Sequence, residues 1–304
     1  MGISKFIKRN LSSLQRNRSK KRVIEDVKSH PQSNEGVINI HRIDYGNVGD
    51  LYCAPHHYFK ELKNSELDIF DFKSADPDIT KKWINKISSN SLIVGGGGLL
   101  NRSSFEMQMK LFEYLSGKNK KTVLWGVGHN QKQWQKNNKI QSYNIDTSKF
   151  GLVGVRDHSM KEEWVPCVSC MHPIFDTNYD IKEETGLIFH KKTIKNKSLL
   201  NRLNEYPSTS NTTNLDDMIS FIGSHETVVT DSYHAMYWAT LLGRKVLAVP
   251  NSSKFFDFKY NPIFTTFKNF ETEIKKAQSY TGVLEECREI NMEFSRKVFD
   301  YLNI

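Results

Sequence analysis

A polar cluster that follows an apolar run offers the most direct candidates for chemistry in this chain. Asp231, Ser232, Tyr233 and His234 come after the apolar residues 227–229 and open a helical pattern. In open α/β sheets, ligands bind where a strand ends and a helix begins, because unpaired N–H groups point into the crevice. An anion is favoured there, and a histidine changes charge near neutral pH. The alternative interpretation is a helix cap with a surface histidine.

A Gly-Asn-Val-Gly-Asp turn at residues 46–50 is a second candidate. Its glycines permit tight backbone turns, and the helix expected after it would present free N–H groups to an anion. Asn47, Gly49 and Asp50 are therefore candidate contacts, with Asp50 a candidate acid or base. The spacing matches neither a dinucleotide fingerprint nor a P-loop. A plain turn is the alternative.

Four consecutive glycines at residues 95–98 follow the apolar run at residues 91–94, and they are a stronger indication of a binding site. Such a run weakens a fold unless another backbone or a ligand approaches it closely. Gly96, Gly97 and Gly98 are expected to offer backbone contacts to a ligand, and Asn101 and Arg102 follow directly.

Arg156 is the fourth candidate, because it ends the apolar segment Val-Gly-Val and a guanidinium binds carboxylate or phosphate at two points. An ordinary ion pair is the alternative. His41 and His129 also lie near predicted strand ends, where a histidine is more often structural. All four clusters fall at the carboxyl ends of predicted strands, so we expect them to line one cleft.

The elements that must position these residues alternate between strands and helices. The predicted strands are residues 37–41, 67–72, 91–94, 122–128, 152–157, 186–190, 227–229 and 245–250. The predicted helices are residues 51–62, 77–88, 105–115, 197–204 and 215–222, with helical spacing in the last forty residues and a loop at 206–214. The strands are apolar throughout rather than alternating, which is typical of parallel sheets covered on both faces.

The pattern breaks around residues 173–180, which indicates a crossing between two domains. We expect an α/β fold with two Rossmann-like domains that face each other across a cleft. The expected divisions are a basic tail at 1–35, a first domain at 36–177, a second at 178–265 and a C-terminal helical segment at 266–304.

The net charge of +9 is concentrated near the N-terminus, since residues 1–22 carry eight lysines and arginines and no acid. Ile3, Phe6, Ile7 and Leu11 fall there at helical spacing, as does Leu14. A basic amphipathic helix suits an anionic lipid surface, and a solvated arm is the alternative. No basic surface with interleaved aromatics occurs elsewhere, which argues against nucleic acid.

No run of 18 apolar residues is present, which disfavours a membrane-spanning helix. Cys167 and Cys170 form a C-x-x-C pair without a second pair, so a structural zinc site is not expected. The absence of a recognisable signal peptide leads us to expect reduced thiols and a cytoplasmic protein.

The ordered set of motifs resembles the polysaccharide pyruvyl transferase family. The set is Gly-Asn-Val-Gly-Asp, Gly-Gly-Gly-Gly-Leu-Leu, Trp-Gly-Val-Gly, Val-Gly-Val-Arg-Asp, and the Ser-Tyr-His helix with Leu-Leu-Gly-Arg-Lys-Val, over about residues 38–255. The resemblance implies a glycosyltransferase-B-like fold and transfer of a pyruvyl group from phosphoenolpyruvate to a sugar. The product is a cyclic ketal on two hydroxyls, phosphate is released, and neither a metal nor a cofactor is implied.

The resemblance also implies residue roles. Arg156 corresponds to the arginine expected to hold the donor's carboxylate or phosphate, and His234 to the histidine expected at the reacting centre. Ser232 stands where the family often has arginine, which leaves the donor short of a cation. Lys254, which follows Ser252 and Ser253, is a candidate replacement.

The reaction needs a proton donor for the methylene carbon and a base for the sugar hydroxyl. His234 fits one of these roles, Asp231 is a candidate for the other, and Asp50 is a further candidate. Tyr233, Ser252 and the other residues of these clusters are candidate donor contacts. The sequence identifies neither the acceptor sugar nor whether that sugar is attached to a lipid carrier.

Two other functions stay open at this point. A glycosyltransferase of the same architecture would use a nucleotide-sugar, although no Glu-x7-Glu pattern occurs near residues 225–245. A binding protein without activity is the second, and the departure at Ser232 favours it.

Overall fold

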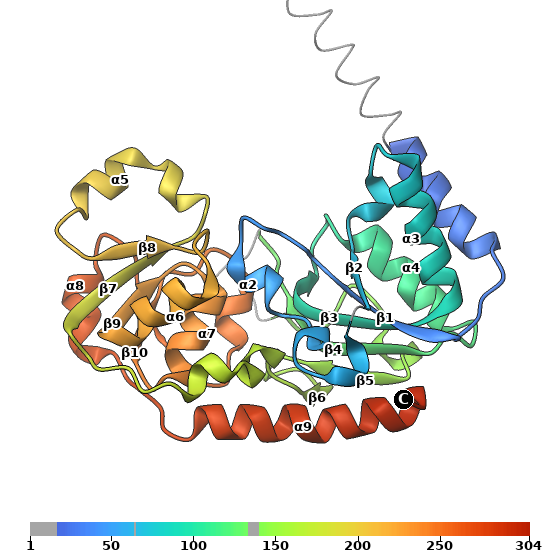
Figure 1. Cartoon of the computed structure of the whole chain (residues 1–304). Helices are drawn as coiled ribbons and strands as arrows, with labels where there is room; N and C mark the ends of the chain where they lie inside the picture. Colours follow the sequence, from blue (N-terminus) through green and yellow to red (C-terminus); the bar gives the residue numbers. More distant parts are fainter. Residues whose placement is uncertain (1–16, 64, 133–139) are drawn as a thin grey trace, which may run out of the picture.

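The protein is built on two parallel β-sheets that lie beside each other (Figure 1). The computed structural model describes residues 17–63, 65–132 and 140–304. The first sheet has the order β2-β1-β3-β4-β5-β6 and the second the order β11-β10-β9-β7-β8. Every strand pairing within the described residues is parallel, as the continuous apolar strands predicted.

The strands of the first sheet are β1 (Gly36–His41), β2 (Glu66–Asp68), β3 (Asn90–Leu100), β4 (Thr122–His129), β5 (Leu152–Val155) and β6 (Glu163–Trp164). Those of the second are β7 (Glu183–Phe189), β8 (Ser208–Ser210), β9 (His225–Thr230), β10 (Lys245–Ala248) and β11 (Ile263–Phe264). The labelled helices are α2 (Val48–Leu51), α3 (Pro77–Ser89), α4 (Glu106–Ser116), α5 (Lys197–Arg202), α6 (Leu215–Ser224), α7 (Tyr233–Leu241), α8 (Phe270–Glu273) and α9 (Val283–Leu302).

The glycine run is strand rather than loop, which corrects the expectation that the strand ends at residue 94. β3 continues through the glycines to Leu100 and pairs with β4, with a register shift between Gly97 and Leu100. Gly96 and Gly97 have φ of 78° and 87°. A Cβ at Gly96 would lie 1.8 Å from the carbonyl oxygen of Cys53. Close backbone approach, as the glycines indicated, is thus the reason for at least one of them.

The segment after β1 differs most from its prediction. Residues 51–62 were expected to form one helix, but α2 has a single turn, and two short 3-10 turns follow at Pro55–His57 and Lys60–Leu62. Pro55 has no backbone N–H and cannot continue a helix through this position. The strand expected at 67–72 is also wrong, because β2 stops at Asp68 and a 3-10 turn begins at Asp71.

The second sheet follows its prediction more closely. β9 leads directly into α7, whose nine residues are all buried, and the chain returns through β10. The predicted loop at 206–214 contains one short strand, β8, which pairs with β7 at the sheet edge.

The N-terminal segment does not stand apart from the fold, contrary to the expectation that folding begins near residue 36. The described chain opens in a helix that runs to residue 29. Val23, Ile24 and Val27 are buried in the core of the first sheet. Lysines and arginines dominate the composition of this segment and obscured its apolar face. The apolar residues predicted at positions 3–14 lie outside the described residues.

The C-terminal helix α9 crosses from one sheet to the other beneath both (Figure 1). Val283 and Cys287 pack in the core of the second sheet, whereas Phe294, Val298 and Leu302 pack on the first. The helical spacing predicted for the last forty residues is confirmed from Val283 onward, and shorter α8 precedes it.

Among the described residues, no helix is both long and apolar enough to cross a membrane.

Candidate active site

A cavity of about 710 Å³ is lined by residues from both sheets. From the first sheet and its connections it is lined by Arg42, Asp44, Asn47, Asp50, Cys53, Phe70, Lys73, Gly96, Gly97, Gly98, Leu99, Arg102, Ser104, Phe105, Asn130, Lys132 and Arg156. From the second it is lined by His190, Lys191, Lys192, Thr193, Asn211, Asp231, Ser232, Tyr233, His234, Asn251, Ser252 and Lys254. The four sequence clusters therefore do meet at one site, because the parallel strands end there.

Arg156 supplies a buried positive charge to this cavity. It follows β5 and is 2% exposed, and its guanidinium carbon lies 4.0 Å from the centre of the Tyr233 ring. Within the described chain, its Nε and Nη1 atoms have no hydrogen-bond partner. Buried donors without partners are costly and therefore rare. A fixed guanidinium with free donors beside a cavity is suited to a carboxylate or phosphate.

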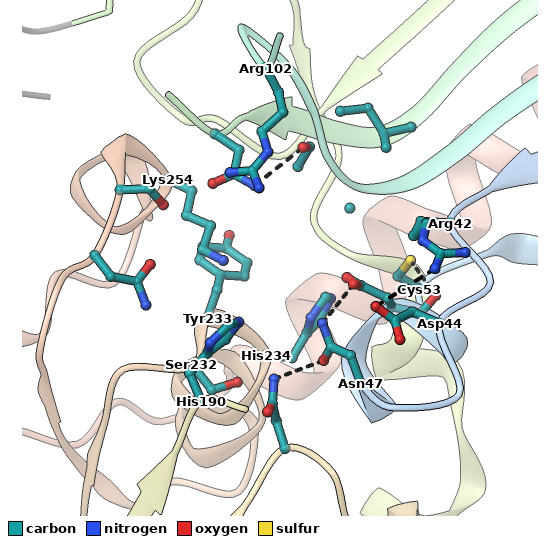
Figure 2. A pocket seen from close by; sticks show the side chains of 18 of the residues that line it. Arg42, Asp44, Asn47, Cys53, Arg102, His190, Ser232, Tyr233, His234 and Lys254 are labelled. Atoms are coloured by element: carbon teal, nitrogen blue, oxygen red, sulfur yellow. Dashed lines mark hydrogen bonds and ion pairs between the residues drawn. The ribbon is translucent and has the colours of Figure 1, made fainter. Parts of the chain in front are cut away.

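Lys254 adds a second cation next to Arg156. Its Nζ atom lies 5.8 Å from the centre of the Tyr233 ring (Figure 2). Burial, reinforced by the nearby Arg156, lowers the pKa of Lys254 to about 8. The lysine is therefore held at a cost in its charged form, and an anion bound between the two cations would restore its usual pKa.

His234 lies at the start of α7 and is packed between the two halves of the site. Its Nε2 atom is 3.6 Å from Cys167 Sγ, and a Cβ added at Gly49 would lie 2.1 Å from its Nδ1 atom. Burial, together with Arg156 and Lys254, lowers the pKa of His234 well below its usual value. The imidazole is therefore neutral near pH 7.

Asp50 faces the same cavity from the glycine turn. Asn47 donates a hydrogen bond from Nδ2 to Asp50 Oδ2 at 2.6 Å, and Asn211 of the second sheet donates to Asn47 Oδ1 at 2.9 Å. Burial raises the pKa of the Asp50 carboxyl. Burial thus favours the neutral form of both Asp50 and His234, which line the same cavity.

Asp231 lines the cavity but its carboxylate is already engaged. Oδ1 accepts from the backbone N–H of His190 at 2.6 Å, and Oδ2 accepts from the Thr193 hydroxyl. These contacts hold the loop after β7 against the end of β9. The geometry therefore gives Asp231 a positioning role.

A comparison with known protein families shows to which of them this chain belongs. The family model for polysaccharide pyruvyl transferase matches residues 47–253. The chain belongs to this family. A search of curated proteins found no match. The matched region carries residues 47–50 of the glycine turn, the glycine run, Arg156 and His234, so the resemblance inferred from the motifs is confirmed.

Three predicted site residues of this polysaccharide pyruvyl transferase family member lie outside the cavity wall. Ser253 is buried and bridges the sheets through His129 Nδ1, at 2.8 Å. Asn101 exchanges hydrogen bonds with Asn144. Gly49 instead provides the space that His234 occupies. Of the serines near Lys254, Ser252 does line the cavity, and its buried hydroxyl has no described partner.

Sequence reasoning missed the polar residues that join the two halves at the cavity edge. Lys191 forms an ion pair with Asp44 across the two halves, and Asn211 accepts the N–H of Lys191 at 2.7 Å. The backbone carbonyl of Asn211 accepts from Val48 at 3.0 Å. His190 and Lys191 directly follow β7, so the strand-end rule that found the other clusters applied here as well.

A second buried network joins the sheets next to the cavity. His129 Nε2 lies 3.3 Å from Asp257 Oδ2, and Asp157 accepts from the His129 backbone at 2.7 Å. Tyr143 donates its hydroxyl to Asp157 at 3.0 Å. Because each carboxylate already accepts hydrogen bonds, these residues are explained as a seam between the sheets. The expectation that the reaction uses no metal stays a prediction.

Proposed function

We propose that the protein transfers a pyruvyl group from phosphoenolpyruvate to two hydroxyls of a sugar, with release of phosphate. The observation that carries the proposal is Arg156, a buried guanidinium with free donors beside Lys254 in a cavity of a polysaccharide pyruvyl transferase family member. Phosphoenolpyruvate carries a carboxylate and a phosphate, so it needs two neighbouring cations. Arg156 and Lys254 supply these two cations. Lys254 takes the place of the arginine that the family often has at the position of Ser232.

We assign the proton movements to Asp50 and His234, which both line the cavity. Asp50, whose pKa is raised, donates a proton to the methylene carbon of the donor. One sugar hydroxyl adds to the resulting cationic carbon and loses its proton to neutral His234. The second hydroxyl then displaces phosphate, which leaves with the remaining proton. The proton that His234 has accepted then returns to Asp50 and replaces the one given to the new methyl group. The proton of the second hydroxyl leaves with phosphate.

The proposed arrangement is that of a glycosyltransferase-B-like protein, with one domain around each sheet and the cavity as the cleft between them. Its support is that the lining residues come from the ends of strands in both sheets. The glycine turn and the glycine run, with Asn47 and Gly96–Gly98, would then contact the acceptor. Donor binding falls to Arg156, Lys254 and Tyr233.

The basic N-terminal segment is proposed to dock the enzyme on an anionic membrane surface on the cytoplasmic side, where a lipid-linked acceptor of a cell-surface polysaccharide would be found. In the described part, Arg18, Lys21 and Arg22 are exposed while Val23 and Ile24 face the core. Each basic residue near such a surface contributes about 1 kcal/mol of attraction. Full-length protein should sediment with anionic vesicles at low salt, and a variant without residues 1–16 should sediment less. Failure of the full-length protein to bind would exclude this role.

Phosphate release tests the reaction most directly. Purified protein is incubated with phosphoenolpyruvate and a panel of lipid-linked and nucleotide sugars, and the products are analysed by mass spectrometry and NMR for a ketal methyl group. Acceptor-dependent phosphate release with a ketal product is expected. Sugar transfer from a nucleotide-sugar, without consumption of phosphoenolpyruvate, would replace the proposal with a glycosyltransferase. Absence of both reactions across acceptors that bind would leave a binding protein.

A further inference from the structure

Three histidines gather on the segment after β1, outside the lining of the cavity. His41 ends β1, and His56 and His57 lie in the 3-10 turn that replaced the predicted helix. The ring centres of His56 and His57 are 4.0 Å apart, and those of His41 and His56 are 5.2 Å apart. One potential ligand atom from each lies within 4.8 Å of the other two.

Two of the imidazoles are oriented by backbone carbonyls of the glycine turn and α2. His41 Nδ1 lies 3.2 Å from the carbonyl oxygen of Asp50, and His57 Nε2 lies 2.7 Å from that of Leu51. A carbonyl only accepts, so the imidazole nitrogen that faces it carries the proton. The other nitrogen of each ring, His41 Nε2 and His57 Nδ1, therefore presents a lone pair.

The third imidazole is oriented by a carboxylate. His56 Nε2 lies 3.2 Å from Glu66 Oε2, so this nitrogen also carries a proton and Nδ1 presents the lone pair. His41 and His56 are 1% and 7% exposed, and neither His41 Nε2 nor His56 Nδ1 has a partner in the described chain. Two buried acceptors without donors are unfavourable in so small a space.

The same pattern is characteristic of metal-binding histidines. A ligating histidine commonly donates its second N–H to a backbone carbonyl or a carboxylate, which fixes the tautomer and directs the lone pair at the ion. Neutral imidazole is the form that binds metal.

We propose that His41, His56 and His57 form a site for a divalent transition metal of the zinc class. Zn–N bonds of about 2.0–2.1 Å in a tetrahedral site place ligand nitrogens about 3.3 Å apart, and in this structure one ring nitrogen from each histidine already lies within 4.8 Å of the other two. His57 is exposed, which leaves the fourth position to water. Imidazole ligands favour zinc, copper, iron and nickel over magnesium and calcium.

The site's place in the fold indicates a structural role. A metal would join the end of β1 to the irregular 3-10 turn, and through Glu66 to β2. The carbonyls of Asp50 and Leu51 face the same imidazoles, so the metal would also fix the glycine turn.

Metal titration of the full-length protein tests the proposal. Chelator-treated protein is titrated with Zn²⁺ by calorimetry and with Co²⁺ by visible absorption, and a 1:1 complex with tetrahedral or five-coordinate cobalt bands is expected. His57→Ala removes an exposed ligand and should weaken Zn²⁺ binding by about 100-fold or more, since loss of an outer partner alone costs about 10–100-fold. Glu66→Gln removes the carboxylate behind His56 and should weaken it by about 10-fold or more.

Controls separate a built site from adventitious binding. His30→Ala removes an exposed histidine outside the cluster and should bind Zn²⁺ as the parent does. Circular dichroism and melting of each metal-free variant confirm that it is folded. Parent protein that binds no Zn²⁺ at micromolar concentration overturns the proposal, as does binding that His57→Ala and Glu66→Gln leave unchanged. The readout is metal affinity and does not depend on whether the protein transfers pyruvyl groups.

Discussion

Two arginines at strand ends line the same cavity, but within the described residues only one of them is paired with carboxylates. Arg42, after β1, pairs with Asp68, lies 3.9 Å from Asp44 and packs on Phe70. Arg156, after β5, packs on Tyr233, and no carboxylate of the described chain forms an ion pair with it. The Arg42 region uses its charges to hold the fold together, whereas the Arg156 region keeps them free. The difference teaches that an unpaired buried charge, rather than charge alone, marks a binding site.

The largest effect on activity is expected from loss of His234, the proposed general base next to Arg156. His234→Ala should lower turnover by about 100-fold or more, because general base catalysis contributes that much. Steady-state phosphate release from phosphoenolpyruvate measures it. The matched control is His129→Ala, which alters a buried histidine of the seam and should lower stability more than turnover per folded enzyme. Near-normal turnover in His234→Ala would remove this residue from the mechanism.

Loss of the free guanidinium is expected to follow in size. Arg156→Met should weaken phosphoenolpyruvate binding by about 2–3 kcal/mol, as for a charge-assisted contact, which is about 30- to 150-fold in Kd. Calorimetric titration measures the donor directly. Because Met lacks charge but fills similar space, the melting temperature should change little or rise. Unchanged donor affinity would place the phosphate and carboxylate elsewhere.

Lys254 should make donor binding depend on pH. Its pKa is lowered to about 8 in the free protein, so it is charged below that value and loses its charge as the pH rises through it. Phosphoenolpyruvate affinity should therefore fall by about 10-fold between pH 7 and 9.5, as one charged contact is lost. Lys254→Arg keeps its charge and should flatten the profile. An equal fall in the Arg variant would assign the titration to another group.

The smallest effect on the donor is expected from the paired arginine. Arg42→Met should change the Kd for phosphoenolpyruvate by less than about threefold, because its charge is already balanced by Asp68 and Asp44. It should instead lower the free energy of unfolding by about 1 kcal/mol, as for a partly exposed ion pair. Chemical denaturation and calorimetry separate the two effects. A loss of donor affinity equal to that of Arg156→Met would end the distinction between the regions.

The sequence was sufficient for the regular half of the site. β9 and α7 follow one another without interruption, and the rule that ligands lie at strand ends placed Arg156, His234 and Asp50 at one cavity. Pairing could not be predicted, because the partners of Arg42 and Lys191 come from other strands or from the other sheet. Asp231 illustrates the same limit, since its hydrogen-bond donors lie about forty residues earlier in the chain.

Local competition explains the elements that were wrong. The helix predicted over residues 51–62 is interrupted at Pro55, which has no backbone N–H to donate. Strand pairing carried β3 through a glycine run that reads as a loop. The helix that runs to residue 29 packs on the first sheet through three buried apolar side chains, although most of its other residues are charged or polar. The last two cases depend on neighbours that are distant in the chain, whereas Pro55 is visible in the sequence itself.

The long C-terminal helix makes the two halves poor units for recombination. Trp125 of β4 donates to Asn291 at 2.9 Å inside the protein, and Phe294, Val298 and Leu302 cover the same sheet. A chimera that takes its first half from one family member and everything after it from another would set a foreign helix on that sheet. Swaps intended to exchange donor or acceptor specificity should therefore inherit residues 283–302 together with the first half.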